Sequence, residues 1–205
     1  MHWESILLFN TVRNNMNRTT IEGLIYLIGF TLCIPAANWM LGNVGTVCPP
    51  ESPCLLPVAP GFAGNPAIMA PSGVLMAGLA LVLRDMVQRR LGKGWALIAI
   101  VIGAALSYLL APPQLVIAST LAFLLSELID FAVYTPLQER RMVLAVVLSS
   151  AVGLVVDSVV FLLMAFGSLD FLAGQIIGKG WMVLLAIPFI WLIRESDTRR
   201  GIVPA

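Results

Sequence analysis

Six long apolar runs constrain the fold of this chain more than any other feature of its sequence. A helix needs about 20 mostly apolar residues to cross the roughly 30 Å hydrocarbon core of a bilayer. Runs of about this length occur at approximately 21–41, 67–87, 95–110, 114–134, 142–166 and 171–193. None alternates apolar and polar residues as the strands of an outer-membrane barrel do. We therefore expect an all-α integral membrane protein, a bundle of six transmembrane helices.

The composition agrees with a protein embedded in lipid and excludes several functions. The chain is 59% hydrophobic and 11% charged, whereas soluble domains carry about 25% charged residues. A net charge of +1 gives no broad basic surface, so nucleic acid is not an expected partner. The one histidine, His2, cannot build a Ser/His dyad or a metal site, and no Walker or zinc motif is present. We expect no enzyme activity, cofactor or metal.

The positions of the cations predict the orientation of the chain in the membrane. Lysine and arginine near helix ends are retained on the cytoplasmic side. With the N-terminus inside, eleven of the 12 cations fall on cytoplasmic segments, and the twelfth, Lys179, lies in the sixth run. The eleven are Arg13, Arg18, Arg84, Arg89, Arg90, Lys93, Arg140, Arg141, Arg194, Arg199 and Arg200. We therefore expect both termini in the cytoplasm, as a segment 1–20 and a tail 194–205 flanking the transmembrane domain 21–193.

The longest predicted loop, 42–66, is rich in proline and glycine and lies on the outer side in this orientation. We expect it to lie against the bundle rather than to form a domain. In an oxidising compartment, Cys48 and Cys54 would form a disulfide that closes a short loop. Two unpaired thiols are the alternative. Cys33, inside the first run, is expected to be a small buried hydrophobic residue.

Five ionisable residues lie within the predicted helices: Asp85, Glu127, Asp130, Asp157 and Lys179. Each costs roughly 2.5 to 3.5 kcal/mol at the bilayer centre, so such residues persist where they pair or line a polar cavity. Asp157 and Lys179 lie at equal depth in neighbouring antiparallel helices. We therefore predict an ion pair between them, which serves either the structure or a ligand.

Three polar residues of the fourth run share one helix face. Glu127, Asp130 and Tyr134 are spaced i, i+3 and i+7. Two carboxylates on one face favour a binding role, most strongly for Glu127. Alternative interpretations are a hydrated Asp130 paired with Arg140 or Arg141, and a surface ion pair of Asp85, which follows Arg84 and precedes Arg89 by four residues.

Small residues line one face of the sixth run, where Gly174 and Gly178 form a GxxxG pattern. Such faces let helices approach closely, and they also allow a homodimer. The alternative is that Gly178 and Gly180 leave space for a ligand beside Lys179.

Four segments carry a further signal in their order along the chain. They are LRDMVQRRLG (83–92), STLAFLLSELIDFAVYTPL (119–137), SSAVGLVVDSVVF (149–161) and GQIIGKGWMVLLAIP (174–188). In this order they resemble the queuosine precursor transporter family, also called the vitamin uptake transporter (VUT) family. Its members are six-helix proteins that import 7-cyano-7-deazaguanine or 7-aminomethyl-7-deazaguanine into bacteria for tRNA modification. The resemblance implies the same function here, in the bacterial inner membrane.

The resemblance also gives the membrane-embedded residues a purpose. A guanine-like edge presents two adjacent N–H groups, which one carboxylate accepts side by side. Glu127 is the first candidate for that role, and Lys179 would donate to the ring oxygen or nitrile. Phe131, Tyr134 or Trp181 would stack on the flat ring. The candidate substrate-binding residues are Glu127, Asp130, Asp157, Lys179, Asp85, Tyr134 and Trp181.

Three questions stay open from the sequence. The main alternative function is a substrate-binding membrane subunit of an energy-coupling-factor vitamin importer, which needs an ATPase complex. A membrane scaffold that transports nothing is a further alternative. Import itself is either passive, with later metabolism trapping the solute, or coupled to protons through a buried acid.

Overall fold

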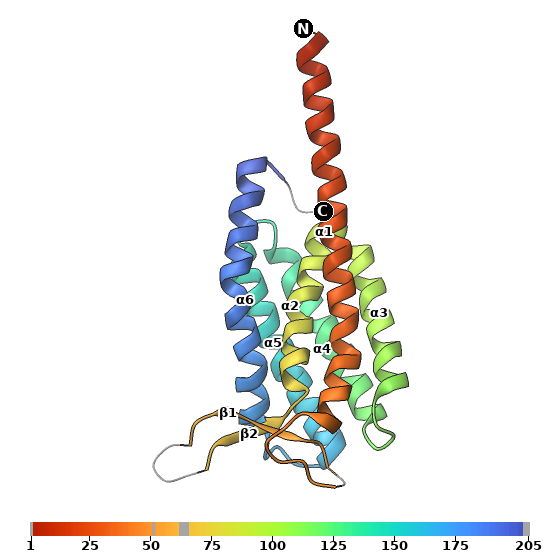
Figure 1. The fold of residues 1–205 in the computed structure, drawn as a ribbon, viewed down its shortest axis with the longest axis vertical. Helices are drawn as coiled ribbons and strands as arrows, with labels where there is room; N and C mark the ends of the chain where they lie inside the picture. Colours follow the sequence, from red (N-terminus) through yellow and green to blue (C-terminus); the bar gives the residue numbers. More distant parts are fainter. Residues whose placement is uncertain (1, 51, 62–65, 203–205) are drawn as a thin grey trace.

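The computed structural model describes residues 2–50, 52–61 and 66–202, with side chains from residue 18 onward. Within this part of the chain, six helices and one antiparallel hairpin form a tall bundle (Figure 1). The helices are α1 (His2–Asn43), α2 (Val74–Leu91), α3 (Lys93–Leu110), α4 (Val116–Leu137), α5 (Met142–Phe166) and α6 (Leu172–Arg200). The strands are β1 (Leu55–Ala59) and β2 (Ile68–Pro71).

Five helices are long and apolar enough to cross a membrane, so the chain is a multi-pass membrane protein. They are α1 from Arg18 onward, α3, α4, α5 and α6. The second predicted span, 67–87, is wrong in part, because 68–71 form β2 and the helix begins only at Val74. The helix α2 carries too many charged residues to meet the same criterion.

The charged helix α2 lies at the centre of the bundle. It packs against all five other helices, and 12 of its 18 residues are buried. The five apolar helices therefore shield from lipid the one helix that lipid would not accept. A left-handed Gly92 (φ 89°) ends α2 and lets the chain turn at once into α3.

The hairpin corrects the all-α prediction, although its position confirms that the loop lies against the bundle. The indole Nε1 of Trp181 donates to the Val58 carbonyl of β1 over 2.9 Å. A disulfide joins Cys48 and Cys54, as the first of the two alternatives predicted. Strands were not expected because β1 reads LLPVA, which has no alternating pattern and contains a proline. Cys33 is buried and unpaired, as predicted.

The two ends of the bundle differ in how they are held together. At the end that carries the hairpin, the hairpin end, strands and loops cover the helix ends (Figure 1). At the opposite end, the terminal end, Asp197 of α6 accepts 2.7 Å and 2.8 Å hydrogen bonds from Arg89 and Arg90 of α2. Arg90 also pairs with Glu22 of α1 at 3.0 Å. Buried ion pairs thus join α1, α2 and α6 there, and the predicted pairing of Arg89 with Asp85 is wrong.

Candidate binding site

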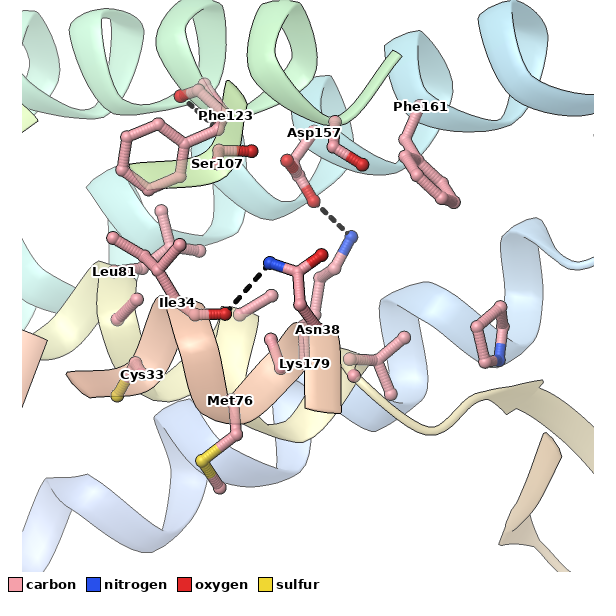
Figure 2. A pocket seen from close by; sticks show the side chains of 18 of the residues that line it. Cys33, Ile34, Asn38, Met76, Leu81, Ser107, Phe123, Asp157, Phe161 and Lys179 are labelled. Carbon is pink, nitrogen blue, oxygen red and sulfur yellow. Dashed lines mark hydrogen bonds and ion pairs between the residues drawn. The ribbon is translucent and has the colours of Figure 1, made fainter. Parts of the chain in front are cut away.

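A cavity lies in the hairpin half of the bundle, and residues of all six helices and of β2 line it. The volume open to the centre of a water molecule is about 120 Å³, and the free space including the open mouth is about 790 Å³. Figure 2 shows Phe123 and Phe161 on opposite sides, with Asn38, Asp157 and Lys179 between them. The polar residues of the lining are Asn38, Ser107, Ser119, Ser126, Glu127, Asp157, Gln175 and Lys179. A mostly apolar cavity with a few convergent polar groups is typical of sites for small organic ligands.

Close contact between α2 and α6 fixes one wall of this cavity. A Cβ atom at Gly78 would lie 2.6 Å from the Lys179 carbonyl oxygen, so only glycine fits there. On α6, a Cβ at Gly178 would lie 2.5 Å from Val74, and one at Gly174 would clash with the Met69 carbonyl of β2. Gly174 and Gly178 therefore serve packing, and Gly178 leaves no space for a ligand beside the lysine. A Cβ at Gly180 would meet no atom within 4 Å, so the packing argument does not extend to Gly180.

The predicted ion pair between Asp157 and Lys179 is confirmed. The Lys179 ammonium donates to Asp157 Oδ2 at 2.5 Å, to Gln175 Oε1 at 2.5 Å and to Ser158 Oγ at 2.8 Å. An ammonium has three protons, and these three acceptors use all of them. A ligand would therefore find no free donor on Lys179. Because the lysine holds the amide oxygen of Gln175, the NH₂ half of that amide is the part left for a ligand.

On the side of the cavity that faces the terminal end, three carboxylates surround one guanidinium group. Arg84 is completely buried, and its Nε lies 3.0 Å from Glu127 Oε2. Its Nη1 lies 2.9 Å from Asp85 Oδ1, and its Nη2 lies 2.8 Å from Asp130 Oδ1. We call these four residues the Arg84 cluster. The cluster ties α2 to α4 through charge-assisted hydrogen bonds and ion pairs, the strongest class of polar contact in proteins.

The cluster corrects three predictions made from the sequence. Arg84 is not a cation of a cytoplasmic loop. Asp130 pairs with Arg84 rather than with Arg140 or Arg141, and Asp85 is completely buried rather than at the surface. The error arose because charges near a helix end were assigned to the membrane surface. The useful signal was the number of charged residues in α2, which exceeds what a lipid-facing helix tolerates and therefore requires protein on all sides.

Neutral polar groups complete the surroundings of the guanidinium. Gln88 accepts from Arg84 Nη1 at 3.2 Å and donates to Thr135 Oγ1 at 2.9 Å. Ser149 of α5 donates to Asp85 Oδ2 at 2.9 Å. Helices α2, α4 and α5 therefore share one continuous network in the interior.

Two aromatic rings predicted to stack on a ligand pack against this network instead. The Arg84 Cζ atom lies 5.9 Å from the ring centre of Phe131 and 5.9 Å from that of Tyr134. Such distances are typical of cation–π contacts. Tyr134 is completely buried. The aromatic residues that do line the cavity, Phe123 and Phe161, were not selected from the sequence.

The predicted site residues therefore separate into three groups. Glu127, Asp157 and Lys179 line the cavity. Asp85, Asp130 and Tyr134 are buried beside Arg84 and are not part of the lining. Trp181 is 49% exposed and faces the hairpin rather than the cavity. Of the cluster, only Glu127 both lines the cavity and contacts Arg84.

Gln175 and Arg84 were also missed by sequence reasoning. Gln175 lies four residues before Lys179 on α6, so the two share a helix face. That spacing was a usable signal. Arg84 could have been found from the charge excess of α2.

Comparison with known proteins gives one match. A family model described as "Putative vitamin uptake transporter" matches residues 107–193. This range contains Glu127, Asp130, Asp157 and Lys179. The searches of curated proteins and of solved structures gave no match. This part of the chain is thus similar to transporters of the vitamin-uptake type. The match covers less than half of the chain and agrees with the resemblance carried by the three motifs inside it, 119–137, 149–161 and 174–188.

Proposed function

We propose that this chain imports queuosine precursors, 7-cyano-7-deazaguanine or 7-aminomethyl-7-deazaguanine, across the bacterial inner membrane. The observation that carries the proposal is the position of Glu127 in an otherwise mostly apolar cavity, with Arg84 3.0 Å behind it. The guanidinium neutralises the carboxylate and so keeps it ionised in a water-poor place. An ionised carboxylate is the acceptor that two adjacent N–H groups of a guanine-like edge require.

The rest of the lining suits a flat, mostly neutral solute. Phe123 and Phe161, on opposite sides of the cavity, offer stacking surfaces (Figure 2). The NH₂ group of Gln175 would donate to the ring oxygen or to the nitrile. Asn38 gives its own NH₂ group to the Ile34 carbonyl at 2.9 Å, so its oxygen is left to accept from the solute. Lys179 thus acts by positioning Gln175 and neutralising Asp157.

The proposed orientation places both termini in the cytoplasm and the hairpin end outside. The disulfide Cys48–Cys54 lies at the hairpin end, and disulfides persist mainly on the oxidising side of such membranes. The cavity would then receive its solute from outside. Fusions of alkaline phosphatase and of a fluorescent protein to the C-terminus test this: only the fluorescent fusion should be active, and an active phosphatase would contradict the orientation.

The role of Glu127 is tested by Glu127→Gln, which replaces one acceptor oxygen by a donor at nearly constant shape. Hydrogen bonds to charged groups contribute about 1.5–3 kcal/mol, so precursor uptake should fall by about ten- to a hundredfold. The matched control is Glu139→Gln, at an exposed position just beyond α4. Uptake is measured with labelled precursor in cells that cannot make it. Normal uptake by Glu127→Gln would remove this residue from substrate binding.

Reconstitution separates the transporter from the two alternatives. The purified chain in liposomes without ATP should take up 7-cyano-7-deazaguanine. Uptake only in the presence of an ATPase complex would favour the energy-coupling-factor subunit. A scaffold would show neither uptake nor thermal stabilisation by the precursor, because a protein is stabilised only by what its folded state binds.

A further inference from the structure

We propose that the Arg84 cluster binds protons and couples substrate import to proton entry. This inference rests on the proposed function and adds its driving force. The ligand is the proton, and its site is formed by the carboxyl groups of Asp85 and Asp130. Glu127, the third carboxylate of the cluster, connects this site to the cavity.

The first argument is the charge balance of the cluster. One guanidinium faces three carboxylates, and every one of the four side chains is at most 2% exposed. The other cation nearby, Lys179, already pairs with Asp157. Among the described residues, no ion pair brings a second cation to the three carboxylates. Two uncompensated negative charges in a lipid-embedded bundle are costly, so the cluster is stable only with carboxyl groups that carry protons.

In the part of the chain whose side chains the structure describes, no other group facing the cluster corrects this balance. Arg89 is held by Asp197 at 2.7 Å. The ionisable residues of α3, Lys93 and Tyr108, are exposed. The remaining titratable groups around the cluster are Cys33 of α1, Tyr134 of α4, Asp157 of α5 and Lys179 of α6. Of these only Lys179 is a cation, and its charge is already matched.

The second argument is a set of buried oxygen atoms without hydrogen-bond partners. Ser149 lies within reach of both Asp85 and Asp130, but its hydroxyl has a single proton, which it donates to Asp85 Oδ2. Among the described residues, Asp130 Oδ2 and the hydroxyl of Tyr134, whose ring packs against Arg84, are then left without a donor or acceptor. Buried polar atoms are otherwise almost always paired. If the Asp130 carboxyl group carries a proton, its unpaired oxygen becomes a hydrogen-bond donor instead of an acceptor that lacks a donor. In the described part of the chain no group of three or more acidic, histidine or cysteine residues is placed to hold a metal ion, which favours a proton over a metal cation.

Glu127 links the protons to the substrate. While Asp85 and Asp130 carry protons, Arg84 remains available to Glu127, which stays ionised and accepts the N–H groups of the substrate. When the protons leave toward the terminal end, the two new carboxylates compete for Arg84. Glu127 then loses its counter-charge and with it the ability to hold the substrate. Protons enter as H⁺ at the hairpin end and leave as H⁺ at the terminal end, and no bond in the substrate changes.

The test uses the purified full chain in liposomes with labelled 7-cyano-7-deazaguanine. An inside-alkaline pH gradient should drive accumulation above the outside concentration, up to about tenfold per pH unit for each proton carried. A pH-sensitive dye in the lumen should record acidification when substrate is added outside. An ionophore that removes the gradient should stop accumulation but leave exchange of labelled for unlabelled substrate. A sodium gradient alone should have no effect, and accumulation driven by sodium would overturn the inference.

Two variants test whether Asp85 and Asp130 form the proton site. Asp130→Asn and Asp85→Asn should lose gradient-driven accumulation while a measurable exchange remains. The matched control is Asp170→Asn, an exposed acid at the hairpin end, which should accumulate substrate as the unmodified chain does. If both cluster variants fail to fold, the gradient experiment on the unmodified chain still decides. Exchange without any gradient-driven accumulation would overturn proton coupling and leave the proposed function standing, whereas absence of exchange would overturn both.

Discussion

Helices α2 and α3 have the same length, 18 residues, and opposite surroundings. Twelve residues of α2 are buried, among them Arg84, Asp85, Arg89 and Arg90. Only five residues of α3 are buried, and all but one of them are alanine, glycine or serine. Its large apolar side chains face outward, such as Leu109, which is 73% exposed.

The difference shows that the interior of this protein takes up polar and small side chains, whereas large apolar side chains face outward. Lipid tails are as apolar as leucine, so an apolar side chain gains little by moving from lipid to the protein interior. A charged or small side chain gains much, because it finds partners or allows close packing. The more polar of two equal helices therefore lies inside.

The largest expected effect comes from removing the central cation of α2. Arg84→Met removes the one cation of the cluster and leaves the ionised Glu127 without a counter-charge, so it should lower the free energy of unfolding by about 3–5 kcal/mol and abolish uptake. The corresponding change in α3, Lys93→Met, affects an exposed residue and should stay within about 0.5 kcal/mol. Thermal unfolding in detergent compares the two. A stable, active Arg84→Met would break the contrast between the helices.

A smaller effect is expected from deleting apolar side chains. Met86 of α2 is 3% exposed in the core, and Met86→Ala should cost about 2 kcal/mol, because a cavity replaces packed atoms. Leu109→Ala in α3 should cost less than about 0.5 kcal/mol, since lipid fills the space that the leucine leaves. Equal losses of stability in the two variants would show that lipid does not surround α3 as proposed.

Adding one methyl group tests how closely each helix is packed. Gly78→Ala in α2 places a Cβ 2.6 Å from the backbone of α6, which cannot move without shifting that helix, so about 1–2 kcal/mol should be lost. Gly94→Ala in α3 meets no atom within 4 Å. It should be neutral or slightly stabilising, because alanine favours helix. Melting temperatures decide, and a harmless Gly78→Ala would mean that α2 and α6 are not in this close contact.

The smallest effect on stability is expected from a change in α3 beside the cavity. In α3, a Cβ at Gly103 would meet the ring edge of Phe123, a side chain that can move. Gly103→Ala should therefore cost less than about 1 kcal/mol, yet shift a ring that lines the cavity and weaken substrate affinity several-fold. The measurement is the concentration of precursor that gives half-maximal uptake. Unchanged affinity would argue that Phe123 does not contact the substrate.

Much of the fold could be predicted from local rules. Run lengths gave five of the spanning helices, but 67–87 was predicted as a sixth span although the four charged residues of α2 set that helix apart. The pair Asp157–Lys179 was predictable because both residues are counted from the same short turn between α5 and α6. A shared reference point fixes relative depth through the constant rise of the helix.

Contacts between helices that no short turn connects could not be predicted. The partners of Arg84 lie on α4, 43 residues away for Glu127. The helix period places a side chain on a face of its own helix, but it does not tell which neighbour covers that face. The same limit explains why Phe123 and Phe161 were missed, and why Tyr134 and Trp181 were chosen as substrate-binding candidates.

The amino-acid sequence by itself determined that this chain enters a membrane, where its helices run and which ionisable residues must find partners there. Only the tertiary structure decided that α2 is the central helix, that Arg84 gathers three carboxylates and that Glu127 stands between this cluster and the cavity. The physical reason is that the cost of a charge in lipid is a property of each residue, whereas its neutralisation depends on which helices come to lie side by side.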